Sequence, residues 1–178
     1  MNKPKVTLVM ACWGRPAVFE IVLNYLHDMM THPAVDADIV FIVSPEDRHK
    51  TRLLKLINSS ALNHTVVLAK NNELGRKHNK GVITALKRNP DYIMNIGSDD
   101  LIHRSIWDLY LPYMIEKFHL IGLRNLCFYE SPENAVSFNY SKVYNMVIGA
   151  GRLIKTSVVS DTINLFGSLY DPRINRGL

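Results

Sequence analysis

One segment constrains the fold of this chain more than any other. It is a short, mostly apolar run, Tyr92–Ile96, and two adjacent acidic residues, Asp99 and Asp100, stand a short way after it. Apolar runs of this length are typical of strands buried within a mostly parallel sheet. Gly97 and Ser98 end the run, and Asp99 and Asp100 come immediately after them. The segment therefore predicts a strand whose carboxyl end carries two acidic side chains.

The placement of Asp99 and Asp100 favours a ligand site. In open α/β sheets, ligands bind in the crevice outside the carboxyl ends of the strands. Two neighbouring carboxylates repel each other, and a hard divalent cation such as Mg²⁺ or Mn²⁺, shared with a phosphate, offsets that repulsion. The alternative is that Ser98, Asp99 and Asp100 only form a turn, since serine and aspartate both favour turns.

The segment upstream of this strand supports the ligand site. Asn72–Leu86, followed by the strand and the Ser98-Asp99-Asp100 tip, resembles the nucleotide-sugar-binding half of family 2 glycosyltransferases, which have the GT-A fold. The resemblance implies a sugar nucleotide donor, for which we favour a UDP-sugar, and a Mn²⁺ or Mg²⁺ cofactor held by Asp99 and Asp100. It also implies transfer with inversion. The first acidic residue of the family's usual Asp-x-Asp triplet would stand at Gly97.

Strand and helix patterns alternate along the chain. Strands are predicted at Val6–Ala11, Ile39–Val43, Thr65–Ala69 and Tyr92–Ile96, with further strand patterns within Leu120–Tyr129 and Val136–Tyr140. Helices are predicted from Pro16 to about Met30, around Leu53–Ile57, from about Leu74 to Lys87, from Ile106 to about Phe118, and from about Ser157. Together with the resemblance, this order predicts an α/β fold of the GT-A (Rossmann-like) type, with a mixed, mostly parallel sheet flanked by helices. We expect a single domain, with a nucleotide-binding half at about 1–104 and an acceptor-side half at about 105–178.

The loop after the first strand is expected to contact the nucleotide. In the family this loop carries an aromatic residue and an arginine near the nucleotide, and Trp13 and Arg15 occupy those places here, after Ala11. Trp13 could pack against a base, and Arg15 could meet a phosphate. The alternative is a core tryptophan with a surface arginine.

Two acidic residues follow the second strand. The family carries an acidic residue there that holds the uracil or the ribose, and Glu46 or Asp47 could do so, because a carboxylate accepts hydrogen bonds from an imide N–H or a hydroxyl. The sequence does not choose between the two. They could also lie in the first turn of a helix with Ser44 as its N-cap, and both roles are compatible.

The helix predicted from about Leu74 adds further donor-site residues. By the resemblance these are Gly75, His78 and Asn79, together with Ser98 at the strand tip. Basic residues in the first turn, Arg76 and Lys77, work against the helix dipole. A nearby anion would remove that disadvantage, which favours a phosphate site at this helix terminus. Further on, Ser105–Asp108 resembles a capping box, so Asp108 is expected to cap a helix.

The end of the chain is expected to lie on the acceptor side. Gly149–Arg152 and Leu169–Arg173 resemble the family's Gly-rich segment and its Leu-Tyr-Asp-Pro-Arg segment, after which a catalytic Asp or Glu commonly follows. The chain ends at Leu178, before that position, so we expect a truncation and assign no catalytic base. Asp171 precedes the expected position and would be a poor substitute.

Composition and charge bear on the partners. The formal charge of +5 and the pI of about 9.2 favour anionic partners, including sugar nucleotides and nucleic acid. No apolar run approaches the length of a membrane span. Cys12 and Cys127 match no metal or redox spacing, so we expect two buried thiols in a cytoplasmic protein.

Three functions stay open at this point. The leading hypothesis is a metal-dependent glycosyltransferase that moves a sugar from a nucleoside diphosphate sugar to an unidentified hydroxyl acceptor. The second is a glycosyltransferase that acts on modified DNA bases, which the positive charge motivates. The third is a catalytically incomplete nucleotide-sugar-binding module, which the missing base motivates.

Overall fold

The computed structural model describes residues 2–129, 134–139, 142 and 145–174. Its elements in chain order are β1 (Lys5–Cys12), α1 (Pro16–Met30), β2 (Asp36–Val43), α2 (Lys50–Ser59), β3 (His64–Leu68), α3 (Leu74–Leu86), β4 (Tyr92–Gly97), α4 (Ile106–Ile115), β5 (Leu120–Ile121), β6 (Asn125–Tyr129), β7 (Ala135–Asn139), β8 (Arg152–Lys155) and α6 (Thr156–Phe166). The predicted alternation of strands and helices up to β4 is confirmed.

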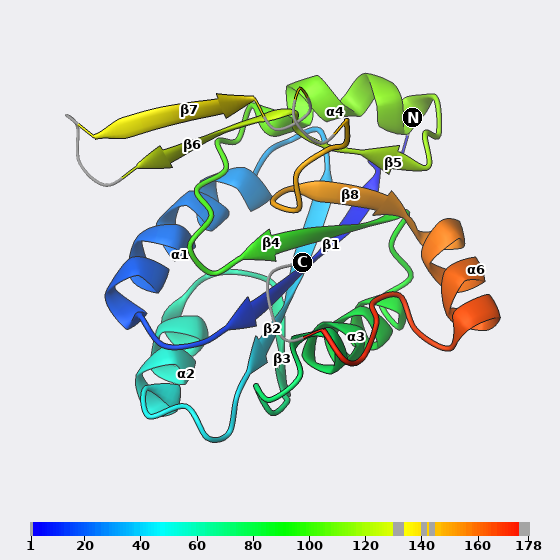
Figure 1. The fold of residues 1–178 in the computed structure, drawn as a ribbon. Helices are drawn as coiled ribbons and strands as arrows, with labels where there is room; N and C mark the ends of the chain where they lie inside the picture. Colours follow the sequence, from blue (N-terminus) through cyan, green and yellow to red (C-terminus); the bar gives the residue numbers. More distant parts are fainter. Residues whose placement is uncertain (1, 130–133, 140–141, 143–144, 175–178) are drawn as a thin grey trace.

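Six strands form the main sheet, in the order β3-β2-β1-β4-β8-β5 (Figure 1). The first four of these are parallel, whereas β8 runs antiparallel to both β4 and β5. Central strand β1 places Leu8 opposite Ile39 of β2 and opposite Met94 of β4. The predicted fold class, α/β with a mixed and mostly parallel sheet, is confirmed.

Helices cover both faces of this sheet (Figure 1). α1, α2 and α4 pack on the face that carries Leu8 and Phe41, whereas α3 and α6 pack on the face that carries Val9 and Ile42. Successive strand residues point to opposite faces, so a strand covered on both sides needs an unbroken apolar run. Polar side chains can therefore gather at the strand ends rather than along the strands.

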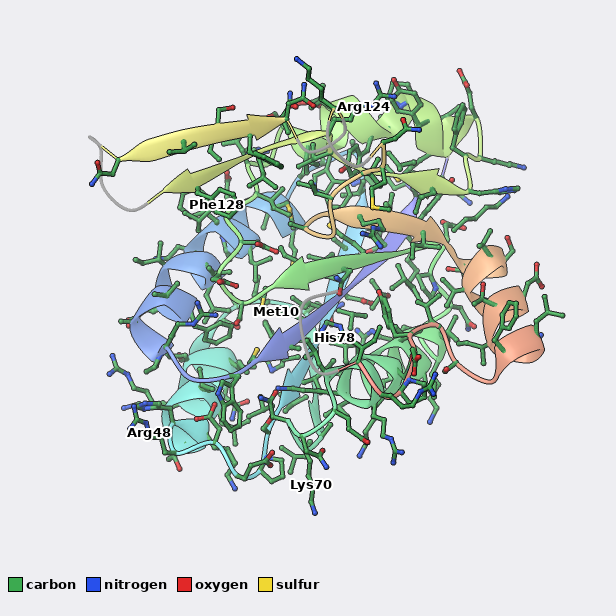
Figure 2. The ribbon with its side chains drawn as sticks, viewed as in Figure 1. Met10, Arg48, Lys70, His78, Arg124 and Phe128 are labelled. Carbon is green, nitrogen blue, oxygen red and sulfur yellow. The ribbon has the colours of Figure 1, made fainter. Side chains whose placement is uncertain are left out.

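A separate two-stranded ribbon, β6-β7, lies beside the main sheet, and Figure 2 shows Phe128 on it. The strand patterns predicted within Leu120–Tyr129 form two strands, but these do not pair with each other, because β5 joins β8 in the main sheet and β6 pairs with β7. Tyr140, predicted to continue the second ribbon strand, lies outside the described residues. Because β6 lies outside the main sheet, Cys127 is exposed, whereas Cys12 is buried as expected.

The capping box predicted at the start of α4 does not form. Ser105 already has helical dihedral angles and caps no backbone N–H. A tight turn precedes it, with Ile106 N–H donating to the carbonyl oxygen of His103, and the Ser105 hydroxyl lies 2.9 Å from His103 Nδ1. The Asp108 carboxylate is therefore no cap and lies 3.5 Å from His32 Nε2.

Among the helices of the described residues, none combines the length and the apolarity that crossing a membrane requires.

Gly81 allows α3 to lie close to the sheet. A β-carbon at this position would overlap Ile42 Cδ1 and lie 2.8 Å from Val9 Cγ1. We expect Gly81→Ala to lower the free energy of unfolding by about 1–3 kcal/mol, the usual effect of overpacking, as measured by urea denaturation. On the exposed side of the same helix, Ile83→Ala should change it by less than about 0.5 kcal/mol. Equal effects of the two variants would contradict the close approach of α3.

Candidate functional site

A cavity of about 530 Å³ lies at the carboxyl ends of β1 and β4. Its walls come from the loop after β1, the residues before and in α3, the end of β4, strand β6 and the loop before β8. The lining residues are Ala11, Trp13, Arg15, Asn71, Leu74, Lys77, His78, Asn95, Ile96, Gly97, Ser98, Asp99, Asp100, Leu126, Ile148, Gly149 and Ala150. The predicted donor residues Ala11, Trp13, Arg15, His78 and Ser98 thus meet the predicted metal ligands at one edge of the sheet.

The loop after β1 takes a left-handed turn into the cavity. Gly14 and Arg15 have φ angles of 59° and 44°. The Gly14 N–H donates to Asp47 Oδ2 at 2.6 Å, which holds the turn. A left-handed conformation is strained for arginine, and such strain is concentrated at functional sites. Arg15 Nη1 lies 2.9 Å from Asp99 Oδ2, so this ion pair links the residues that follow the neighbouring strands β1 and β4.

Trp13 lies at the surface of the cavity and not in the core. Its side chain is 43% exposed, whereas the second tryptophan, Trp107, is fully buried. The ammonium group of Lys77 lies 5.9 Å from the centroid of the Trp13 ring, within the range of a cation–π contact. The alternative of a core tryptophan at position 13 is therefore wrong.

The tip of β4 folds both carboxylates back over Gly97. The Gly97 N–H donates to Asp100 Oδ2 at 2.6 Å. A β-carbon at residue 97 would lie 2.8 Å from Asp100 Oδ2 and 3.1 Å from Asp99 Oδ1. A side chain at this position would displace both acids, which is a physical reason for glycine where the resemblance suggests an aspartate.

The two carboxylates fit a hard divalent cation that also binds a diphosphate. Burial raises the pKa of Asp100, and the neighbouring charge of Asp99 adds to this, so a cation would stabilise the ionised pair. In the described part of the chain, no three histidine, cysteine, aspartate or glutamate side chains are grouped to hold a metal ion. Mg²⁺ is commonly held by one or two carboxylates plus substrate phosphates. A cation here would therefore depend on ligands from a bound nucleotide.

Lys77 is a buried cation at the back of the cavity. It is 1% exposed, and its ammonium donates to the Cys12 carbonyl oxygen, Ser44 Oγ and Asn71 Oδ1 at 2.8–2.9 Å. These acceptors lie at the end of β1, at the end of β2 and before α3, so one side chain joins three segments. Burial lowers the pKa of Lys77 from 10.5 to about 8, and the nearby Cys12, Glu46 and Asp47 oppose this only in part.

His78 lies beside Lys77 on the inner side of α3 (Figure 2). Burial, and to a lesser degree the ammonium of Lys77, lower the pKa of His78 from 6.5 to about 4, so the ring is neutral at pH 7. His78 Nδ1 and Asn95 Oδ1 have no well-aligned hydrogen-bond partner among the described residues, although Asn95 is close enough to favour the protonated ring. A neutral ring offers a ligand one hydrogen bond and no charge.

The acidic residues after β2 are not among the residues that line the cavity. Asp47 accepts from Gly14 N–H and from His49 N–H, and Glu46 accepts from the backbone N–H of Asn71 at 2.6 Å. The alternative with Ser44 as an N-cap is wrong, because α2 begins only at Lys50. Asp47 is thus placed to hold the loop after β1, and a contact of either acid with the nucleotide stays a prediction.

The C-terminal segment covers the start of α3. Asn79 exchanges two hydrogen bonds with the backbone of Tyr170, at 2.8 and 2.9 Å. Gly75 N–H donates to the carbonyl oxygen of Ile174 at 3.0 Å, and a β-carbon on Gly75 would overlap the carbonyl oxygen of Asp171. Neither Gly75 nor Asn79 therefore lines the cavity, and the phosphate site expected at this helix terminus is occupied in part by the chain itself.

Both basic residues in the first turn of α3 have partners within the chain. Arg76 forms an ion pair with Glu73, while Lys77 turns inward to its three oxygen acceptors. No anion is needed to account for either side chain.

Asp171 lies on the same segment, outside the cavity lining, and pairs with Arg173. Three hydrogen bonds from Arg173, between 2.8 and 3.0 Å, lower the pKa of Asp171 from 3.8 to about 2. A carboxylate with so low a pKa is a weak proton acceptor at pH 7. Its use as a catalytic base stays a prediction with little physical support.

The hold of Asn79 on the C-terminal segment can be tested. We expect Asn79→Ala to speed amide exchange at Tyr170 by roughly tenfold or more, because two hydrogen bonds are lost. Asn79→Asp keeps an acceptor for the Tyr170 N–H and should have a smaller effect. Hydrogen–deuterium exchange with mass spectrometry measures both, and unchanged exchange in the alanine variant would show that the segment is held by other contacts.

Sequence reasoning missed several lining residues. Asn95 interrupts the apolar run of β4, and a lone polar residue in a buried strand was a usable signal. Leu126 and Ile148 carried no such signal, since only the folding of β6 and of the loop before β8 brings them to the cavity. Lys77 lies in the first turn of a helix, and nothing in the local sequence indicates that its ammonium group joins three segments at the cavity.

No protein-family model matches the sequence, and no curated protein does either. Solved structures do match it. TarS of S. aureus in complex with UDP gives a TM-score of 0.71 at 12% identity, covering 95% of this chain and 50% of that one. Mannosyltransferase PcManGT from Pyrobaculum calidifontis, in complex with GDP-Man and Mn²⁺, gives 0.66 at 12% identity, covering 90% and 47%. A 4-diphosphocytidyl-2C-methyl-D-erythritol synthase from Anaerococcus prevotii gives 0.62 at 10% identity, covering 94% and 78%.

These similarities concern the fold. They confirm the expected GT-A architecture, a mostly parallel sheet between helices. The chain spans about half the length of TarS residues 1–349 and of the mannosyltransferase chain to which it was matched.

Proposed function

We propose that this chain forms the donor-binding domain of a metal-dependent glycosyltransferase that uses a nucleoside diphosphate sugar. One observation carries the proposal: the cavity at the ends of β1 and β4 combines two cations, Arg15 and Lys77, with two carboxylates, Asp99 and Asp100. A nucleoside diphosphate together with a divalent cation complements this set of charges. The fold similarity to a UDP complex of TarS and to a mannosyltransferase with GDP-Man and Mn²⁺ supports the same ligand class.

Asp99 and Asp100 would hold the cation, which when bound would supply Lewis-acid stabilisation of the departing nucleoside diphosphate. Asp99 must then leave its ion pair with Arg15. That exchange is easy, because the pair is about half exposed and such pairs contribute only about 0–1 kcal/mol. The released guanidinium of Arg15 lies at the cavity mouth, where it would meet a phosphate.

The remaining walls suggest where the other parts of the donor lie. Trp13 offers an exposed ring on which a base can stack. Leu126 and Ile148–Ala150 come from the second half of the chain, and we assign them to the sugar and acceptor side. This assignment places the nucleotide against residues of the proposed half at about 1–104, and the sugar and acceptor against residues of the half at about 105–178. The identities of the sugar and of the acceptor stay open.

Tryptophan fluorescence tests the donor site. Trp13 is exposed at the cavity, whereas Trp107 is buried and its indole N–H donates to the Met29 carbonyl oxygen at 2.9 Å. UDP or GDP with Mn²⁺ should quench the emission of the wild-type protein in a saturable way and should raise its melting temperature. Trp13→Phe should lose the quenching but not the Trp107 emission. Absence of binding with every nucleoside diphosphate and sugar nucleotide, with and without Mn²⁺, would overturn the proposal.

A second candidate is nucleotidyl transfer. The synthase of a diphosphocytidyl compound shares the fold, and this chain covers 78% of it, compared with 50% of TarS 1–349 and 47% of the mannosyltransferase chain. The same titration separates the candidates when nucleoside triphosphates are included. Stronger binding of a triphosphate than of any diphosphate or sugar nucleotide would favour this second function.

A further inference from the structure

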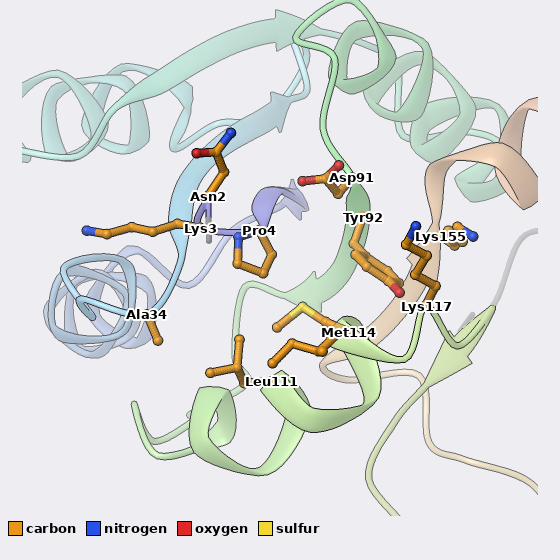
Figure 3. A pocket seen from close by; sticks show the side chains of 11 residues that line it. Asn2, Lys3, Pro4, Ala34, Asp91, Tyr92, Leu111, Met114, Lys117 and Lys155 are labelled. Carbon is orange, nitrogen blue, oxygen red and sulfur yellow. The ribbon is translucent and has the colours of Figure 1, made fainter.

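A second cavity, of about 640 Å³, lies at the opposite end of the sheet, where the chain enters β1 and β4 (Figure 3). Its volume is in the range of small-molecule sites. Apolar groups form its floor, namely Pro4, the Tyr92 ring, Leu111 and Met114. Three lysines also line it, Lys3, Lys117 and Lys155.

Lys117 occupies a backbone position that favours glycine. It follows the last turn of α4 with a φ angle of 61°. The Lys117 N–H donates to the Met114 carbonyl oxygen, and the Phe118 N–H donates to the Tyr113 carbonyl oxygen. The rings of Tyr113 and Phe118 meet edge to face, with their centroids 5.4 Å apart. This is a Schellman motif, in which glycine is usual because a β-carbon is strained in the left-handed conformation. A lysine gains from the helix dipole anywhere in the last turn, so the dipole does not require it at this residue.

Lys155 also occupies a position that its residue type does not favour. It ends β8 and is the N-cap of α6, with no side-chain capping hydrogen bond. Serine, threonine, aspartate and asparagine are the preferred N-caps, and a cation is disfavoured at the positive end of a helix. Both lysines line the same cavity, and Figure 3 shows them on its Tyr92 side. Neither ammonium group has a hydrogen-bond or ion-pair partner within the described residues.

We propose that this cavity binds an anionic amphiphile, with its carboxylate or phosphate between Lys117 and Lys155 and its apolar part on the floor. Residues that break local preferences without a structural benefit are expected at functional sites. The one carboxylate among the described lining residues, Asp91, accepts from the backbone N–H of Lys5 at 2.8 Å and is outnumbered by the three lysines. The site lies at the other end of the strands from the donor cavity, so it is independent of the proposed function.

Calorimetry with decanoate and decyl phosphate, kept below micelle formation, tests the ligand class. We expect saturable binding of both to the wild-type chain, and no comparable binding of decanol, decyltrimethylammonium or inorganic phosphate. Equal affinity for decanol would overturn the ionic part of the proposal. Equal affinity for inorganic phosphate would overturn the apolar part.

Two substitutions separate binding from folding. Lys117→Gly relieves the left-handed strain, and Lys155→Ser introduces a preferred N-cap, so each should keep or raise the melting temperature. Each should nevertheless weaken decanoate binding by about tenfold, since a charge-assisted contact is lost. The exposed Lys55 of α2 provides a control, and Lys55→Ser should bind decanoate like the wild type. Wild-type affinity in both cavity variants would overturn the site.

Discussion

Asp99→Ala should weaken the binding of UDP in the presence of Mn²⁺ by roughly 10- to 100-fold, as measured by calorimetry, because a charged ligand of the proposed cation is removed. Without a divalent cation the effect should be much smaller, and it could reverse, since the substitution frees Arg15 to contact phosphate. Folding should hardly change. The ion pair of Asp99 with Arg15 is about half exposed, and such pairs contribute only about 0–1 kcal/mol.

The chain contains a matched control for this experiment. Asp28 and Arg104 form another exposed ion pair, with Asp28 Oδ1 3.0 Å from Arg104 Nη1, and neither residue lines the donor cavity. Asp28→Ala should therefore leave UDP affinity unchanged, with or without Mn²⁺. Equal affinities of the Asp99→Ala and Asp28→Ala variants would remove Asp99 from the proposed metal site.

Lys77→Met should abolish a pH dependence of stability that the wild-type chain shows in mild alkali. The pKa of Lys77 is about 8 in the folded chain and 10.5 ordinarily, so the unfolded chain binds this proton more tightly. Below pH 8 both states are charged and the burial of the charge opposes folding in full. Between pH 8 and 10.5 the folded lysine is neutral, and its contribution to the free energy of unfolding rises with pH.

The expected size of this effect can be stated as a difference between proteins. From pH 7 to pH 9.5, the free energy of unfolding of the wild type should rise by about 2 kcal/mol relative to Lys77→Met, as measured by urea denaturation at each pH. Taking the difference cancels the titration of groups that do not interact with Lys77. Parallel pH profiles of the two proteins would show that Lys77 is not a buried cation.

Lys80→Met is the control on the same helix. Lys80 is exposed and donates to the Leu68 carbonyl oxygen at 2.8 Å, so its replacement should leave the pH profile unchanged. Lys77→Met should also weaken UDP binding by about tenfold, because Ser44, Asn71 and the Cys12 carbonyl lose their shared donor and the cavity loses a cation. Lys80→Met should not.

The sequence by itself determined the order of the first strands and helices and the place of the two acids. Hydrophobic periodicity is local, so a run such as Tyr92–Ile96 identifies a buried strand without knowledge of its neighbours. The break at Gly97 then places Asp99 and Asp100 at the strand end, where parallel sheets bind ligands. Trp13 and Arg15 follow β1 in the same way, because neighbouring parallel strands end at the same edge.

Only the tertiary structure decided which polar side chains hold this edge together. From the local sequence, Lys77 is expected to be a surface residue in the first turn of a helix. In the structure it is buried against the ends of β1 and β2. Asp47 supports the Gly14 turn across 33 residues, and Asn79 holds Tyr170 across 91. These partners are distant in sequence, and local periodicity carries no information about which distant segments meet. Packing of the helices and strands against one another sets these distances, and with them the side chains that face the cavity.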